Sequence, residues 1–209
     1  MKTIFFLILV LIFLTACGQT KNRNTNSAYK IDTKLKDKIE QKVKSYNGVT
    51  KGSMEKIKIY ENDSLIGDSY TNGKSFESRT MSTLEGDTAN ITGFLGMFAG
   101  LGFQITLYRD TCIIRHFAKS DAEIYKLNKS DSLTFGVSVP CKSYKLILVN
   151  KPTFKKGDVI EGIIELSSEN YYEVANGKEN KSRVELIGYF KTEPLQSLDD
   201  KLKKYDEQK

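Results

Sequence analysis

The sequence predicts a mainly β protein: an antiparallel β-sandwich, or a barrel-like sheet, with a basic N-terminal helix and a short C-terminal helix. From residue 103 onward, apolar and polar residues alternate in short runs, which is the period of a half-buried strand. The runs recur about every 10 residues and are separated by turn-forming segments such as NKSD, KKGD and NGKEN, a spacing typical of antiparallel sandwiches. Strands do not alternate with long helical periods, so the sequence does not indicate an α/β fold.

Residues 1–16 have the features of a signal peptide. Lys2 precedes an uninterrupted apolar run from Ile4 to Leu14, and two small residues follow the run. A permanent spanning helix needs about 20 apolar residues, so this run is too short for one. We therefore expect residues 1–16 to be removed.

The segment Leu14-Thr15-Ala16-Cys17 resembles the lipobox of bacterial lipoproteins. The resemblance covers only about the first 18 residues, and it implies that the Cys17 sulfur carries a diacylglycerol after cleavage. Cys17 would then anchor the protein to a membrane, because several acyl chains buried in the bilayer give stable attachment, whereas a single chain gives only weak, reversible binding. The residue after Cys17 is Gly18, and by the same resemblance the outer membrane is the expected destination, with the outer face of a Gram-positive cell membrane as the alternative.

Residues 17–28 are polar and lack apolar periodicity, which predicts a flexible linker to a single β-rich domain over residues 29–205. The positive charge of the chain is concentrated near the anchor, since residues 17–60 hold eleven Lys or Arg against four Asp or Glu. Such a stretch is attracted to anionic headgroups, although it is also compatible with a solvated linker and helix face. A protein of the cell envelope is not expected to bind nucleic acid.

A helix is predicted over residues 31–47. Apolar residues recur at helical spacing from Ile31 to Tyr46, Asp32 or Thr33 can cap the start, and Gly48 can end the helix. Its apolar stripe is narrow, so the helix should lie on a surface. A short C-terminal helix is expected after Ser197, where Leu198, Leu202 and Tyr205 follow Leu195 at helical offsets.

Short alternating runs over EKIKIYEND and RTMSTLEG predict strands in a hairpin-rich region. The other expected strands cover residues 103–109, 112–118, 122–127, 132–139, 144–150, 158–167, 171–175 and 183–191. In the strand of residues 158–167, Ile160, Ile164 and Leu166 form the buried face, and Glu161 and Glu165 should face solvent. In the strand of residues 183–191, Val184, Leu186 and Phe190 share the buried face.

Cys112 and Cys141 remain after Cys17 is lipidated. Thiols outside the cytoplasm tend to be oxidised, so a disulfide between these two residues is one possibility and two buried free thiols are the other. No Cys-x-x-Cys pair occurs, so a thioredoxin-like redox site is not indicated.

The stretch GFLGMFAGLGF, residues 93–103, contains four glycines and no charge. Its glycine spacing matches neither a dinucleotide-binding loop nor a P-loop, and no Lys follows to meet a phosphate. A spanning helix over residues 89–108 is disfavoured because Thr92, Gln104 and Thr106 interrupt the run and its second half alternates like a strand. Two interpretations remain: a short helix or loop packed on the sheet, or a tip that exposes Phe94, Met97 and Phe98 to a lipid, an apolar ligand or a protein partner.

The sequence contains little that indicates catalysis. His116 is the single histidine, and it is better explained as a strand residue with its hydrogen bonds satisfied than as a general base. No cluster with metal-ligand spacing is present, so we expect no metal and no cofactor. The sequence therefore predicts a lipid-anchored, non-catalytic binding or envelope-assembly module, with an envelope hydrolase that uses carboxylates as the alternative.

Overall fold

The structure is a computed structural model that describes residues 29–46, 49–68, 76–96 and 99–196, without the side chains of residues 44–46 and 49–51. Its elements in chain order are β1 (Lys30–Ile31), the 3-10 helix η1 (Thr33–Leu35), α2 (Lys36–Lys42), β2 (Lys44–Tyr46), β3 (Val49–Glu61), β4 (Ser64–Asp68), β5 (Phe76–Glu85), β6 (Thr88–Gly96), β7 (Gly100–Tyr108), β8 (Thr111–Lys119), β9 (Tyr125–Lys126), β10 (Gly136–Leu148), β11 (Ile160–Ser168), β12 (Tyr171–Ala175), β13 (Lys178–Thr192) and β14 (Leu195–Gln196).

The strands form one continuous sheet, not the two separate sheets of a sandwich, and the prediction of a mainly antiparallel β protein is confirmed. Among the described strands, only the two-residue strands β1 and β14 pair in parallel, with β10 and β5. The path of pairing runs β3-β5-β6-β7-β8-β10-β11-β13, and β13 then pairs with β3 again. The sheet therefore closes on itself through the β13–β3 pairing.

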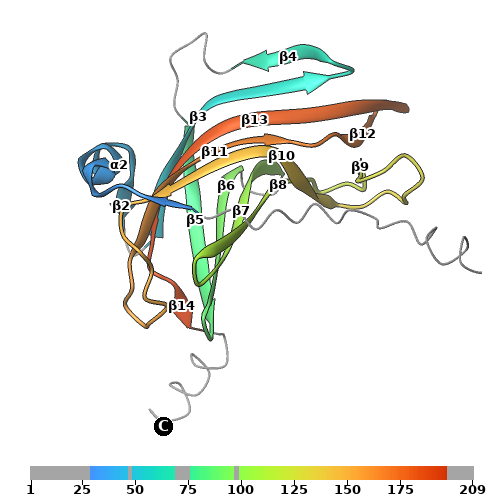
Figure 1. Cartoon of the computed structure of the whole chain (residues 1–209). Helices are drawn as coiled ribbons and strands as arrows, with labels where there is room; N and C mark the ends of the chain where they lie inside the picture. The colour runs from blue at the N-terminus through green and yellow to red at the C-terminus, as the bar shows by residue number, and fades with distance from the viewer. Residues whose placement is uncertain (1–28, 47–48, 69–75, 97–98, 197–209) are drawn as a thin grey trace, which may run out of the picture.

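The sheet is strongly bent (Figure 1). Strands β5 to β8 descend steeply, whereas β11, β12 and much of β13 run across the upper part of the molecule. The long strands β3 and β13 turn from one direction to the other, and so belong to both parts of the sheet. The apolar core lies inside this bend, where the inward side chains of the two parts meet.

The alternation predicted for the later strands is confirmed, because the expected apolar faces of β11 and β13 are buried. Two predicted strands, 132–139 and 144–150, are one long strand, β10, which continues through Pro140. Proline lacks an N–H but can still accept a hydrogen bond. Pro140 pairs with Arg115 of β8, and its carbonyl accepts from the N–H of Glu169. The proline therefore does not end the strand.

The prediction of a helix over residues 31–47 is wrong in its length. Asp32 does cap the helical segment, accepting a hydrogen bond from the N–H of Lys34 at 3.0 Å. The helix ends at Lys42, because Val43 is extended and the next three residues pair with the start of β3 as strand β2. Strand pairing outweighs helix propensity here. Nor is the helix strongly basic, since α2 holds three Lys, one Asp and one Glu.

Helix α2 packs on the outer face of the sheet through Ile39 and Val43. These side chains form a small apolar cluster with Val149, Ile163 and Tyr189, which come from the end of β10 and from β11 and β13. The expectation that this helix lies on a surface therefore holds. The predicted C-terminal helix lies outside the described residues, apart from Leu195, which is in strand β14.

The main core is organised around the ring of Phe103, on β7, which is fully buried. A Cβ added to its neighbour Gly93, on β6, would lie 2.1 Å from the ring, and one added to Gly188, on β13, would lie 2.6 Å from it. The ring also packs against Phe190, with 5.8 Å between centroids. Phe103 thus connects the steep strands to the upper strands, and two glycines provide the space for it.

We expect Gly93→Ala to lower the free energy of unfolding by about 1 to 3 kcal/mol, the usual cost of overpacking a core. In a Phe103→Leu background the same substitution should cost at least about 0.5 kcal/mol less, because the smaller side chain leaves room for the new methyl group. Urea unfolding of the four variants in this cycle measures the coupling.

Gly67→Ala is the matched control for this cycle. A Cβ at Gly67 would be 3.6 Å from the nearest atom of Ile59, so its effect should stay within about 0.5 kcal/mol. An equal cost of Gly93→Ala in both backgrounds would show that Phe103 does not need this glycine.

Candidate functional site

The described residues of the glycine-rich stretch lie mostly in two paired antiparallel strands, and no helix is found among them. Residues up to Gly96 belong to β6, and residues from Gly100 onward belong to β7. Within the described ranges, no helix has the length and apolar composition needed to cross a bilayer.

Phe94 is half-buried on the outer face of this hairpin and stacks on Phe117 of β8, with ring centroids 5.6 Å apart. It is therefore not a fully exposed contact residue. Met97 and Phe98, the other two residues of the expected apolar tip, lie outside the described residues, as does Cys17, the expected site of lipidation.

In the structure no disulfide joins Cys112, which is buried, and Cys141, which is partly buried. Pro140, the neighbour of Cys141, pairs with Arg115, and Cys112 lies three residues before Arg115 on β8. Burial raises the pKa of the Cys112 thiol to about 11 and that of the Cys141 thiol to about 12. Neither thiol is suited to act as a nucleophile at neutral pH, because the thiolate is the reactive form.

His116 is fully buried in the core. Its Nδ1 lies 2.9 Å from the carbonyl oxygen of Gly102, so this nitrogen carries the proton and donates it. Its Nε2 has no hydrogen-bond partner among the described residues, and the ring lies 5.6 Å from that of Tyr171. The expectation of a satisfied strand histidine holds for Nδ1 and not for Nε2. A fully buried imidazole of this kind is out of reach of a substrate.

The carboxylates that the hydrolase alternative requires do not converge around His116. Glu161 was expected to face solvent, but it is only 6% exposed, because it lies on the face that α2 covers, and it pairs with Lys191 at 3.3 Å. Glu165 is exposed, as expected. In the part of the chain that the structure describes, no three His, Cys, Asp or Glu side chains are placed to hold a metal ion.

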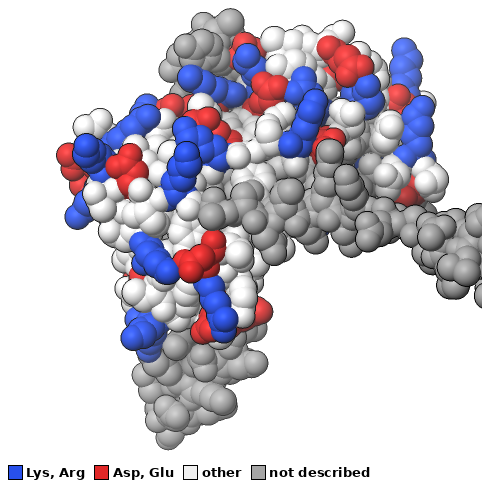
Figure 2. Space-filling model, viewed as in Figure 1, with Lys and Arg blue, Asp and Glu red and all other residues white. Residues whose placement is uncertain are grey.

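A groove of about 630 Å³ lies on the outer face of four neighbouring strands, β10, β11, β13 and β3. Five cationic side chains and two carboxylates line it, which gives an excess of three positive charges. The charged residues are Lys56, Lys58, Lys142, Lys145, Arg183, Glu165 and Glu185. Elsewhere on the face shown in Figure 2, cationic and anionic side chains are intermingled.

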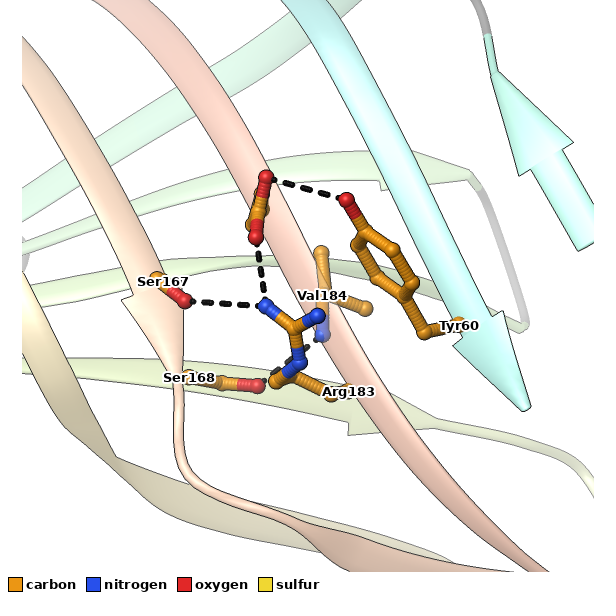
Figure 3. A network of polar contacts seen from close by, with 6 residues as sticks. Tyr60, Ser167, Ser168, Arg183 and Val184 are labelled. Carbon is orange, nitrogen blue, oxygen red and sulfur yellow. Dashed lines mark hydrogen bonds and ion pairs between the residues drawn. The ribbon is translucent and has the colours of Figure 1, made fainter. Parts of the chain in front are cut away.

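Arg183 is fixed at one side of the groove by three contacts (Figure 3). Its guanidinium binds the carboxylate of Glu185, its Nη1 lies 3.5 Å from the Ser167 hydroxyl, and it stacks on the Tyr60 ring at 3.9 Å from the centroid. The Tyr60 hydroxyl donates to the other oxygen of Glu185 at 3.3 Å. Both oxygens of Glu185 are therefore already bound by neighbouring side chains.

Two β-bulges turn lysines toward this groove. On β3, Lys58 pairs with Glu185 and Glu55 with Ile187, so two residues, Lys56 and Ile57, face one residue of β13. On β10, Lys142 is the extra residue between the pairs that Cys141 and Ser143 make with β11. Bulges change the direction of a side chain and are frequent at functional sites. Lys56 also has a φ of 49°, a conformation that costs a non-glycine residue about 1 kcal/mol or more.

The groove was not predicted from the sequence, although a local signal was present. Each bulge appears as two consecutive polar residues between inward-facing ones, in Met54-Glu55-Lys56-Ile57 and in Cys141-Lys142-Ser143-Tyr144. A single break in alternation marks a bulge but does not say which strands it will meet. The pairing of β3, β13, β11 and β10 is what assembles the lysines.

A second, smaller cavity of about 300 Å³ has a balanced charge. It is lined by Lys129, Lys181, Asp63 and Glu179 together with Asn62 and Tyr172. Lys181 pairs with Asp63 at 2.6 Å, and Glu179 pairs with Lys126 at 2.8 Å. Both carboxylates of this cavity are thus paired with lysines of the protein.

The buried histidine predicts a pH dependence of stability. Burial lowers the pKa of His116 to about 4 from its ordinary value of 6.5, and the hydrogen bond to Gly102 opposes this only in part. Below pH 6.5 the unfolded chain binds a proton that the folded chain does not accept until about pH 4. Stability should therefore fall between these values, by about 3 kcal/mol for this one group.

The measurement is urea unfolding at a series of pH values for the wild type and for His116→Gln, which keeps a polar side chain and does not titrate. Because the acidic residues titrate alike in both proteins, the difference between the two curves reports His116. Parallel curves between pH 6.5 and 4 would contradict the assignment.

Comparison with known proteins leaves the chain unassigned. No protein-family model, no curated protein and no solved structure matches it. The groove and the first residues of the chain are therefore the features that bear on its function.

Proposed function

We propose that the chain is a lipid-anchored cell-envelope protein, attached to a membrane through Cys17, that binds a ligand in the groove on β10, β11, β13 and β3 without transforming it. The binding part of this proposal rests on one observation, the large groove with its excess of positive charge. The anchoring part rests on the resemblance of Leu14-Thr15-Ala16-Cys17 to a lipobox.

The groups inside and around the core support binding more than catalysis. The imidazole of His116 is buried, both thiols have raised pKa values, and Glu185 is held by Arg183 and Tyr60. A general acid or base has to reach the reacting group, which a side chain fixed in this way does poorly. The closed order of pairing also supports the barrel-like description of the sheet over the sandwich.

The outer membrane is the destination that Gly18 favours in this proposal, and the basic residues between the anchor and β3 would add attraction to anionic headgroups. The described domain begins at Tyr29, whose hydroxyl donates to the carbonyl of Arg109 at 2.8 Å. A linker of about 11 residues can extend roughly 35 Å. The groove would thus be presented away from the membrane surface.

Metabolic labelling with a palmitate analogue tests the anchor. Wild-type protein should carry the label and sediment with membranes, and Cys17→Ser should lose the label because no thiol remains for acylation. Cys141→Ser is the matched control, since it removes a cysteine of the folded domain, and it should be labelled like the wild type. Equal labelling of the wild type and Cys17→Ser would overturn the proposed anchoring.

A further inference from the structure

We propose that the ligand of the groove is a linear phosphate-bearing chain, bound through the phosphates by lysines on β3 and β10, the two outer strands of the four that form the groove. This inference rests on the proposed function and names the chemical class of its ligand. It is carried by the charge of the groove, by the direction of its lysines and by the way in which its single arginine is already used.

The charge of the groove favours an anionic ligand. Lys58, Lys142 and Lys145 line the groove, and their ammonium groups make no ion pair or hydrogen bond within the part of the chain that the structure describes. Of the nearby acids, Glu185 is bound by Arg183, and Glu55, next to the bulge, pairs with Lys42 at 2.5 Å. The lysines repel one another in the free protein, and an anionic ligand removes that repulsion.

The backbone directs two of the lysines to the groove. The extra residue of each bulge is a lysine, Lys56 on β3 and Lys142 on β10, and these strands are the two outer ones of the four that form the groove. Lys56 keeps a left-handed φ of 49° that glycine would adopt at less cost. Strain of this kind is frequent at functional sites. Both irregularities have the same result, a lysine at the groove.

The width of the groove favours a chain of phosphates over a single one. Neighbouring strands lie about 4.8 Å apart, so the lysines on the two outer strands of the four are on the order of 14 Å apart. A single phosphate cannot contact both outer strands, whereas a chain of phosphates can. Arginine is the side chain whose fork suits a carboxylate, and Arg183 is occupied by Glu185. The remaining donors are lysines, which bind phosphates as point charges.

The test uses the full-length lipidated protein in a nonionic detergent and an end-labelled linear polyphosphate, with binding followed by fluorescence anisotropy over a range of salt concentrations. Poly-glutamate of matched length replaces the phosphates by carboxylates. Inorganic phosphate and glycerophosphoglycerol, the soluble headgroup of an anionic phospholipid, are added as competitors. These arms separate an extended phosphate chain from a carboxylate chain, a free phosphate and a lipid headgroup.

The triple variant Lys58→Gln, Lys142→Gln, Lys145→Gln should bind polyphosphate at least about tenfold more weakly. Its dependence of log Kd on log salt should be shallower by roughly 2, about 0.7 for each phosphate that a lysine no longer neutralises. The control is Lys119→Gln, Lys155→Gln, Lys156→Gln, which removes the same charge from exposed positions outside the groove. The control should bind like the wild type.

Lys56→Gly separates binding from folding. It removes one groove lysine and relaxes the left-handed backbone, so its affinity for polyphosphate should fall, and its melting temperature, measured alongside, shows whether the fold is retained. A loss of affinity with no loss of stability cannot come from misfolding.

The inference is overturned if the wild type does not bind polyphosphate, or if the control variant loses as much affinity as the groove variant. It is also overturned if poly-glutamate binds as tightly as polyphosphate, or if inorganic phosphate or the headgroup competes as strongly per phosphate as the chain. The proposed function fails by a different route. Polyphosphate shortened after incubation with the protein would indicate hydrolysis, and absent palmitate labelling would indicate no anchor, in both cases with binding at the groove intact.

Discussion

The architecture depends on one contact across the core, the ring of Phe103 between Gly93 and Gly188. The two parts of the bent sheet approach closely enough to exclude water because a large flat side chain on β7 meets a strand that has no side chain at that point. This contact gives the glycine-rich stretch its physical role. Gly93 and Phe103 are the first and last residues of this stretch. They pair across β6 and β7, and the Phe103 ring packs against Gly188 of β13.

The outer face of the sheet at β13 has two regions, one behind the contact with Phe103 and one that carries the groove. Near Gly188, the outward side chains of Ile187 and Tyr189 are covered by α2, together with Ile163 of β11. Toward the other end of the same strands, the outer face carries Arg183, Glu185 and the groove lysines, and α2 does not extend over it. Because α2 is only seven residues long, it shields one part of this surface and leaves the other open to a ligand.

Much of the fold could be predicted from local sequence, and the candidate site could not. Alternation identified the buried faces of β11 and β13, and Asp32 was recognised as a helix cap, because these features depend on neighbouring residues. The predicted length of the first helix was wrong because residues 44–46 pair with β3. Helical periodicity in the sequence carries no information about that pairing. The groove could not be predicted for the same reason, because its cations come from positions between residues 56 and 183. Only the order of the strands brings them together.

The two bulges show how a binding surface can be built without a loop. A regular strand places every second side chain outward at fixed intervals, so neighbouring strands offer a lattice of positions set by the pleat. An extra residue shifts one side chain off that lattice at the cost of local pairing. Lys56 and Lys142 are both displaced in this way on the two outer strands of the groove, and Lys56 keeps a backbone conformation that disfavours any side chain at all. Glycine would adopt this backbone conformation at less cost, so the bulge places a charged side chain at the groove at a cost to the fold.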